Sequence, residues 1–212
     1  MSKTLYYVFD PLCGWCYGAG AAVAAVDKEA QIQIQLLPSG LFSGKGARPI
    51  DDSFAAYAWS NDQRIERLTG QRFTERYRNE VLAKHGQMFD SGPATIALTA
   101  VSVTSADHEF EALKAIQQAR YIHGKDITQS STLIEVLQSL GLQQAVARLA
   151  RPDDELLSAN QLRVASAQAL LNQFGARGVP TFILETNGQR QLLHPGTAFS
   201  NPQAFVEQLA AA

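Results

Sequence analysis

Hydrophobic and polar positions follow two different periods along the chain. Residues 5–9 form a short apolar and aromatic run that suits a buried strand, and Asp10-Pro11 breaks it. The alanine-rich stretch that follows predicts a helix from the cysteines to about Ala30. Residues 31–36 alternate polar and apolar side chains, which predicts a strand with one covered face that stops at Pro38. Together these segments predict a βαβ unit.

From residue 51 to about residue 174 the pattern is helical and predicts no strand. Pro93 fits the first turn of one helix, and Gly124 fits the end of the next. Residues 132–135 fit a capping box that starts a further helix, which Gly141 ends. This stretch is therefore a block of helices inserted into another fold.

After the helical block the strand pattern returns. Residues 181–184 form an apolar run directly after Pro180, and Asn187-Gly188 is a strong signal for a two-residue hairpin. Residues 191–194 fit the returning strand, and Asn201-Pro202 fits the cap of a final helix. The predicted order is strand, helix, strand, helical block, strand, strand, helix, which belongs to the α/β class.

The candidate chemistry lies at the start of the first predicted helix. Cys13 and Cys16 are the chain's two cysteines, and at helical spacing they share one face within reach of a disulfide. The unpaired N–H groups and partial positive charge of a helix start stabilise a thiolate there. We therefore expect Cys13 to be the nucleophile and Cys16 the resolving thiol.

Composition narrows the class of protein. The 212 residues are 46% hydrophobic and 18% charged, with a net charge of -2, as in an ordinary soluble globular protein. Nothing indicates nucleic acid or a membrane as a partner. Because the first residues show no signal-peptide cleavage site, we expect a cytoplasmic protein, in which a catalytic disulfide is more common than a structural one.

Other candidate sites are weaker. Residues 40–46 superficially resemble a phosphate-binding loop, but the spacing is one residue short, so we interpret them as a plain loop. We expect no metal site, because the histidines lack metal-ligand spacing. They are His85, His108, His123 and His194.

Several polar and aromatic residues have two interpretations. Asp10 is either a turn former or a proton acceptor for Cys16, and we favour the turn. His194 fits a strand end better than a catalytic group. Three aromatic residues fit either a substrate groove or a helix packing face, and we favour packing. They are Phe54, Tyr57 and Trp59.

The element order, together with Cys13-Gly14-Trp15-Cys16 and Val179-Pro180-Thr181, resembles the thioredoxin fold. The inserted helices resemble its DsbA-like branch, and residues 9–18 and 124–128 resemble the cytoplasmic, FrnE-like group of predicted protein-disulfide isomerases. The resemblance covers essentially the whole chain.

The resemblance also implies a domain organisation. Residues 1–50 and 175–212 would form the thioredoxin-fold domain, and residues 51–174 an inserted helical domain that includes the helix returning to the first.

In the family, the bond before the motif proline is cis and lies beside the dithiol. The resemblance thus implies a cis Val179-Pro180 bond and a free Val179 backbone that pairs with an extended substrate. It implies substrate contacts at Gly14, Trp15, Val179 and Pro180. Trp15 stands where some oxidising relatives have histidine and adds no charge, so the direction of electron flow stays open.

We therefore expect a thiol-disulfide oxidoreductase or protein-disulfide isomerase, either monomer or homodimer. Its partners would be protein dithiols and disulfides or a small thiol, without a metal or prosthetic group and with glutathione as a candidate co-substrate. One alternative is a glutathione-dependent isomerase or transferase like the kappa class, against which Cys16 argues. Another is a redox-sensing interaction protein.

Overall fold

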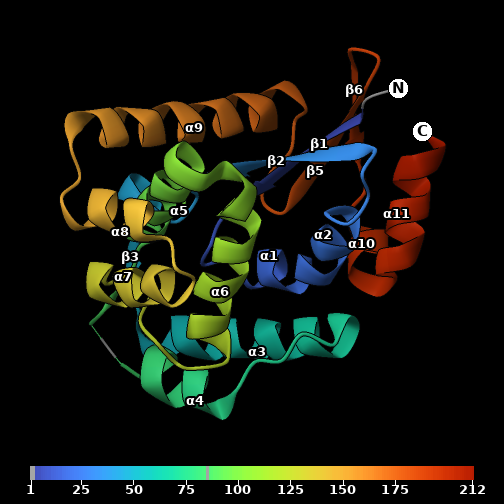
Figure 1. The fold of residues 1–212 in the computed structure, drawn as a ribbon. Coiled ribbons are helices and arrows are strands. Elements are labelled where there is room, and N and C mark those ends of the chain that lie inside the picture. The colour runs from blue at the N-terminus through green and yellow to red at the C-terminus, as the bar shows by residue number, and fades with distance from the viewer. Residues whose placement is uncertain (1–2, 85) are drawn as a thin grey trace.

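The computed structural model describes residues 3–84 and 86–212, so His85 lies outside the described residues. A sheet with helices on both faces forms one part of the molecule, and a group of helices packs beside it (Figure 1). This arrangement confirms the predicted α/β class with a large helical part. The division into two domains stays a prediction.

The main sheet of the described residues has the strand order β2-β1-β5-β6. The first strand, β1 (Lys3–Phe9), pairs in parallel with β2 (Ile32–Pro38) and antiparallel with β5 (Thr181–Thr186). The edge strand β6 (Gln189–Leu193) pairs with β5. Asn187 and Gly188, between them, both have positive φ, as a type I′ hairpin requires.

The helices cover both faces of this sheet and extend beyond one end of it. They are α1 (Gly14–Gly18), α2 (Gly20–Val26), α3 (Asp52–Thr69), α4 (Glu75–Tyr77), α5 (Gly92–Ser105), α6 (Glu109–Tyr121), α7 (Ser130–Ser139), α8 (Gln143–Ala150), α9 (Asp154–Gln173), α10 (Gly196–Ser200) and α11 (Pro202–Ala211). Shorter helical turns are η1 (Gly44–Gly46), η2 (Arg78–Leu82) and η3 (Ala106–His108).

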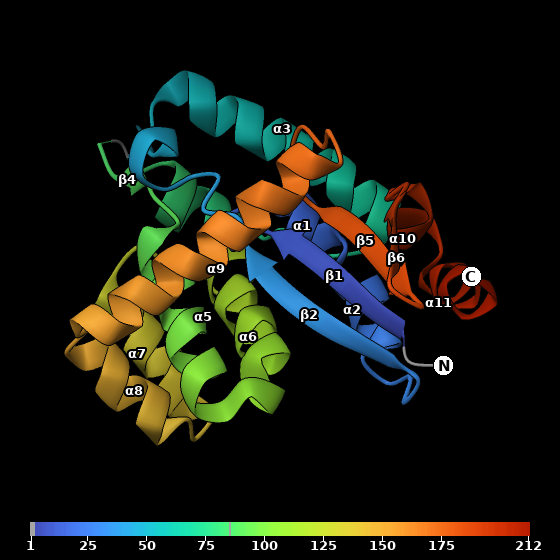
Figure 2. The ribbon, with the colours of Figure 1, turned by 90° about the horizontal axis from the view of Figure 1, so that it is seen from above.

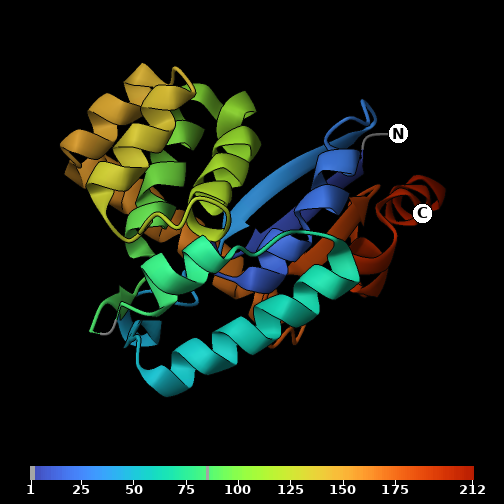
Figure 3. The same ribbon diagram turned by 90° about the horizontal axis from the view of Figure 1, so that it is seen from below.

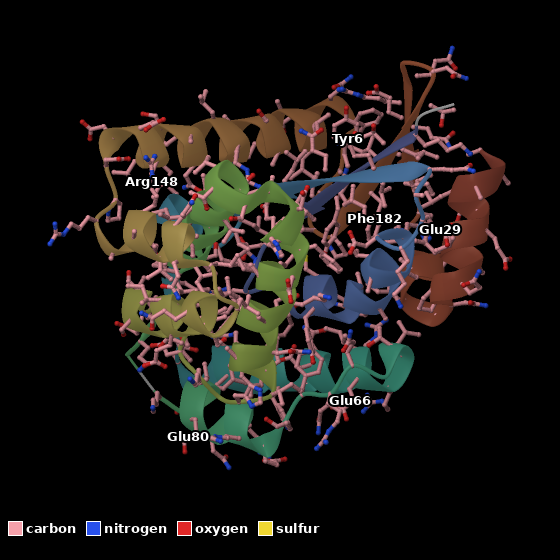
Figure 4. All side chains as sticks on the ribbon, viewed as in Figure 1. Tyr6, Glu29, Glu66, Glu80, Arg148 and Phe182 are labelled. Carbon is pink, nitrogen blue, oxygen red and sulfur yellow. The ribbon has the colours of Figure 1, made fainter. Side chains whose placement is uncertain are left out.

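The alternation of side chains along the strands explains the layers. Leu5, Tyr7 and Phe9 of β1 join the large core together with residues of α2 and α11. Val8 points the other way, into a smaller core with α9, which lies across the sheet in Figure 2. Phe182 of β5, labelled in Figure 4, is fully buried on the first face, and its ring stacks on that of Tyr7. The sheet is therefore covered on both sides.

The helix α3 lies below α1 in Figure 1 and is seen from its own side in Figure 3, and one unpredicted short strand precedes it in the chain while another follows it. These strands, β3 (Arg48–Pro49) and β4 (Met88–Phe89), pair antiparallel. The expectation of no strand between residues 51 and 174 was therefore wrong for β4. Two residues are too short to show a period of two, so no pattern indicated them.

Two helix predictions also need correction. The first helix is not continuous to Ala30, because Ala19 divides it into α1 and α2, and α2 ends at Val26. Gly18 and Gly20 lie on either side of Ala19, and glycine weakens a helix. The capping box at residues 132–135 was wrong, because α7 already begins at Ser130. Glu135 instead forms an ion pair with Lys125 at 3.0 Å.

Arg163 of α9 joins the helices to the sheet. Its guanidinium pairs with Glu109 of α6, donates to Thr99 Oγ1 of α5 at 3.0 Å, and donates to the Leu36 carbonyl of β2 at 3.0 Å. Burial raises the pKa of Glu109, and the Arg163 charge and hydrogen bond oppose this. The Arg163 side chain thus links α9 to α5, α6 and β2.

We predict that Arg163→Ala lowers the free energy of unfolding by about 3–5 kcal/mol, because it leaves the Glu109 carboxylate buried and unpaired. Urea unfolding measures the change. The matched control is Arg148→Ala, at the position labelled in Figure 4, where Arg148 pairs with the exposed Glu155 at 3.1 Å. It should lose at most about 1 kcal/mol. Equal losses in the two variants would contradict the assignment.

Candidate active site

The loop after β1 positions the two cysteines. Asp10 ends the strand, and its main-chain oxygen accepts a hydrogen bond from Cys13 N at 3.0 Å. Cys13 caps α1, with its carbonyl accepting from Tyr17 N at 3.0 Å, and Cys16 lies one turn later. Both are free thiols. The predicted placement at a helix start is confirmed, although α1 is only five residues long.

Asp10 is fully buried and organises this loop. One carboxylate oxygen accepts from Leu12 N at 3.0 Å, and the other accepts from Phe42 N at 3.1 Å and from Ser91 Oγ at 2.7 Å. Burial raises the pKa of Asp10, and these donors oppose the rise. The turn interpretation is confirmed. Its ties to Phe42 and Ser91 follow from the tertiary fold and had no local signal.

The two thiols have different surroundings. Cys16 is fully buried, and burial raises its pKa well above the ordinary value, with the hydrogen bond and charge of Cys13 adding to the shift. The carbonyl of Cys16 accepts from the buried Tyr7 hydroxyl at 3.0 Å. Cys13 is 7% exposed and lines a cavity. Access from outside the protein is therefore to Cys13.

The segment before β5 closes over the dithiol from the other half of the chain. The Val179-Pro180 bond is cis. Cys13 Sγ lies 3.5 Å from the Val179 carbonyl oxygen, to which it donates. Thr181 Oγ1 donates to the Gly178 carbonyl at 2.7 Å and so fixes this turn. The structure thus brings Cys13 and Val179 together across 166 positions of sequence.

A cavity of about 310 Å³ opens beside Cys13. Its walls are mainly aromatic and apolar, with a few polar groups from α3 and β3. The lining residues are Leu12, Cys13, Gly14, Trp15, Phe42, Arg48, Phe54, Tyr57, Ala58, Asn61, Asp62, Ile65, Tyr77, Phe89 and Tyr121. Such a lining is typical of a site for a small ligand or a single side chain.

The three aromatic residues of α3 separate into two groups. Phe54 and Tyr57 line the cavity, and Tyr57 is 67% exposed, so core packing was the wrong interpretation for Tyr57. Phe54 also packs against the main core. Trp59 does not line this cavity and packs against a separate, partly aromatic core cluster. The centre of its ring lies 5.2 Å from the guanidinium carbon of Arg78. Packing is confirmed for Trp59.

Asp62 is a carboxyl group in the cavity wall that the sequence did not indicate. It is 5% exposed, and its Oδ2 accepts from the Tyr77 hydroxyl at 3.0 Å. Burial raises the pKa of Asp62 to about 7, opposed by the Tyr77 hydrogen bond and by the charge of Arg120. A Cβ at Gly14 would lie 2.4 Å from Asp62 Oδ1. Glycine between the cysteines is therefore required by this carboxyl group.

Arg120 lies behind the aromatic wall. It is 1% exposed, and its guanidinium carbon is 5.3 Å from the ring centres of both Tyr77 and Phe89. Within residues 3–84 and 86–212, its Nε and Nη2 have no hydrogen-bond partner. The neighbouring Tyr121 donates through its hydroxyl to the Leu12 carbonyl at 2.8 Å. A buried cation thus faces the Asp62 carboxyl group.

Trp15 is held by contacts from two elements. Its ring lies 5.0 Å from Phe199 of α10, and the Arg64 guanidinium of α3 lies 5.7 Å from its centre. Arg48 similarly covers Phe54 at 5.1 Å. Trp15 itself adds no charge, but arginines distant in sequence place positive charge over the rings of Trp15 and Phe54.

The described part of the chain contains no cluster of three or more His, Cys, Asp or Glu side chains that suits a metal ion. His194 follows β6, and its Nδ1 accepts from Gly196 N at 3.2 Å, which fits the strand-end interpretation. None of the described helices combines the length and apolar character needed to cross a membrane.

The family model of the DSBA-like thioredoxin domain matches residues 4–210. The cytosolic disulfide reductase DsbM from Pseudomonas aeruginosa is 31% identical, with a TM-score of 0.85 over 98% of this chain and 97% of that chain. Its structure with GSH is 30% identical, with a TM-score of 0.83 over 98% of each chain.

A structure from Nitrosomonas europaea, 24% identical, shows the same fold with a TM-score of 0.81 over 100% of this chain and 97% of that chain. No curated protein matches the chain. The comparisons thus confirm the DsbA-like thioredoxin fold.

We predict that Gly14→Ala lowers the free energy of unfolding by about 1–3 kcal/mol, because its methyl group would overlap the Asp62 carboxyl group. The urea midpoint at constant slope measures the loss. Gly178→Ala is the matched control, since a Cβ there meets no atom within 4 Å. If Gly14→Ala were as stable as the control, α3 would not lie where we place it.

We also predict that Asp62→Asn becomes more stable than the wild type as the pH rises. The folded-state pKa of Asp62 is about 7, above the ordinary value of about 3.9, so the neutral carboxyl stabilises the fold fully below about pH 4. That contribution is lost as the pH rises through about 7. The free energies of unfolding, measured by urea unfolding, should coincide near pH 4 and differ by on the order of 3 kcal/mol at pH 8. A pH-independent difference would contradict this.

Proposed function

The chain belongs to the DSBA-like thioredoxin domain family, and we propose that it is a thiol-disulfide oxidoreductase in which Cys13 is the nucleophile and Cys16 the resolving thiol. The observation that supports these roles best is the difference in access. Cys13 lines the cavity next to the Val179 carbonyl, whereas Cys16 is sealed beneath it. A substrate sulfur in the cavity therefore meets Cys13 first.

The proposed reaction has two exchanges. The Cys13 thiolate attacks one sulfur of a substrate disulfide, a Cys13-substrate disulfide forms, and the other substrate sulfur leaves with the bonding electrons and takes up a proton. Cys16 then loses its proton and attacks Cys13 Sγ, which releases the second substrate thiol and leaves the Cys13-Cys16 disulfide. The substrate is reduced by two electrons and the protein is oxidised; the reverse steps oxidise a dithiol.

Substrate contacts are proposed on both sides of Cys13. The loop of Val179 and cis-Pro180 directly precedes β5, lies beside the thiol and offers backbone groups to an extended peptide. Gly14 and Trp15 form the opposite wall, where the indole provides an apolar surface. This arrangement supports binding without a strict sequence requirement.

We further propose glutathione as the small-thiol co-substrate and the cytoplasm as the location. The relative DsbM is described as a cytosolic disulfide reductase and has been solved with GSH. In this chain, a cavity of about 310 Å³ beside Cys13 has room for a cysteine-sized thiol group, and Arg48 in its wall suits a carboxylate. The exchange chemistry itself uses the two thiols and no metal.

We predict that Cys16→Ala accumulates a stable mixed disulfide with glutathione after exposure to glutathione disulfide, because the resolving thiol is missing. Intact-protein mass spectrometry detects the adduct. The matched variant Cys13→Ser, with Cys16 buried, should form none and should lose insulin reduction.

An adduct on Cys16 in Cys13→Ser would reverse the two roles. Full disulfide-reductase activity in Cys13→Ser would refute the proposed function. Multiple turnover of a small-molecule substrate by Cys16→Ala would instead favour the glutathione-dependent isomerase or transferase.

A further inference from the structure

We propose that Asp62 is the proton-transfer group of this site, accepting the proton of the Cys13 thiol and delivering it to the sulfur that leaves the substrate disulfide. The inference rests on the proposed function, since it concerns the first exchange at Cys13. It assigns a catalytic role to a residue of α3, outside the dithiol motif and outside the turn of the cis proline.

Asp62 lies in the wall of the cavity that a substrate sulfur must enter to reach Cys13. Its carboxyl group and Cys13 line the same cavity, and Gly14 is the residue of α1 that separates them. Oδ1 lies so close to Gly14 that any side chain there would collide with it. Within the described chain, Oδ2 accepts from Tyr77 and no hydrogen-bond donor reaches Oδ1. One oxygen is therefore anchored and the other is available to the cavity.

Charged and titratable groups surround Asp62 on all sides that pack against it. Cys13 lies toward α1, Tyr77 donates from α4, and Arg120 and Tyr121 face it from α6. Arg48 of β3 and Tyr57 of α3 complete the charged and titratable groups of the cavity wall.

Burial favours the neutral acid of Asp62, whereas the Tyr77 hydrogen bond and the Arg120 charge favour the carboxylate. The opposition of these effects holds the pKa of Asp62 at about 7, where one group serves as both base and acid.

Asp62 alone accounts for both proton transfers of the first exchange at Cys13. Asp62 Oδ1 takes the proton as Cys13 Sγ becomes a thiolate, and the thiolate then attacks the nearer substrate sulfur. The electron pair of the broken S–S bond stays on the departing sulfur, which takes the same proton from Asp62. The carboxylate is regenerated, and no outside acid or base is consumed.

The test uses Cys16→Ala as the parent protein, so that only the first exchange is observed. The reduced protein is mixed with bis(2-hydroxyethyl) disulfide from about pH 5 to about pH 10, and quenched mass spectrometry gives the rate of adduct formation. The parent should show a bell-shaped profile, because the reactive form carries one proton shared between Cys13 and Asp62. Adding Asp62→Asn should abolish the alkaline descent and reduce the neutral rate by about 10²-fold.

Two tyrosines provide matched controls. Tyr77→Phe removes the donor to Oδ2 and should move the alkaline descent to higher pH, because the neutral carboxyl is then favoured. Tyr17→Phe removes a hydroxyl that lies outside the cavity and donates to the Arg72 carbonyl at 3.1 Å, and should leave both midpoints unchanged. Carbon-13 NMR of the Asp62 carboxyl should show a midpoint near neutrality.

An unchanged profile in Asp62→Asn, or a carboxyl midpoint near 4, would overturn the proton-transfer role alone. A parent whose Cys13 forms no adduct at any pH would overturn the proposed function and this role with it.

Discussion

The site depends on how closely α3 approaches α1. A Cβ at Gly14 would lie 2.4 Å from Asp62 Oδ1, and one at Gly18 would lie 2.5 Å from Ile65 Cγ2. Only glycine at both positions lets the two helices meet. This contact brings the Asp62 carboxyl group against Gly14, between the two cysteines. The helix α3 therefore supplies one wall of the cavity beside Cys13.

The opposite wall comes from the second half of the chain. The sheet pairs β5 with β1 over Val8 and Thr181, so the turn of Val179 and Pro180 arrives where β1 delivers the cysteines. Asp10 fixes the loop between them through donors from Leu12, Phe42 and Ser91. Asp10 thus holds the loop. Burial raises the pKa of the Cys16 thiol, and the charge of Asp10 also raises it. The reactive thiol thus lies between two rigid elements.

The sequence predicted what depends on local pattern. The βαβ unit, the dithiol at a helix start and the hairpin at Asn187-Gly188 all have signals within a few residues. It did not predict Asp62, which occupies an ordinary polar position of a helix until Gly14 and Tyr77 enclose it. The packing interpretation of Tyr57 failed for a related reason. Helical periodicity identifies a face of α3, but the partner of that face is set by tertiary structure.

The charges around the dithiol likewise come partly from the local sequence and partly from tertiary structure. Trp15 is neutral, so the motif itself offers nothing beyond a short helix start to tune a thiolate. The tertiary structure adds Arg48 and Arg64 over the rings of Phe54 and Trp15, Arg120 behind the aromatic wall, and Asp62 within it. Arg48 and Arg64 are exposed and screened by solvent, whereas Asp62 is buried, and burial raises its pKa against the Tyr77 hydrogen bond and the Arg120 charge. In the proposed mechanism the protonation of Asp62, and not the dithiol motif alone, governs the first exchange at Cys13.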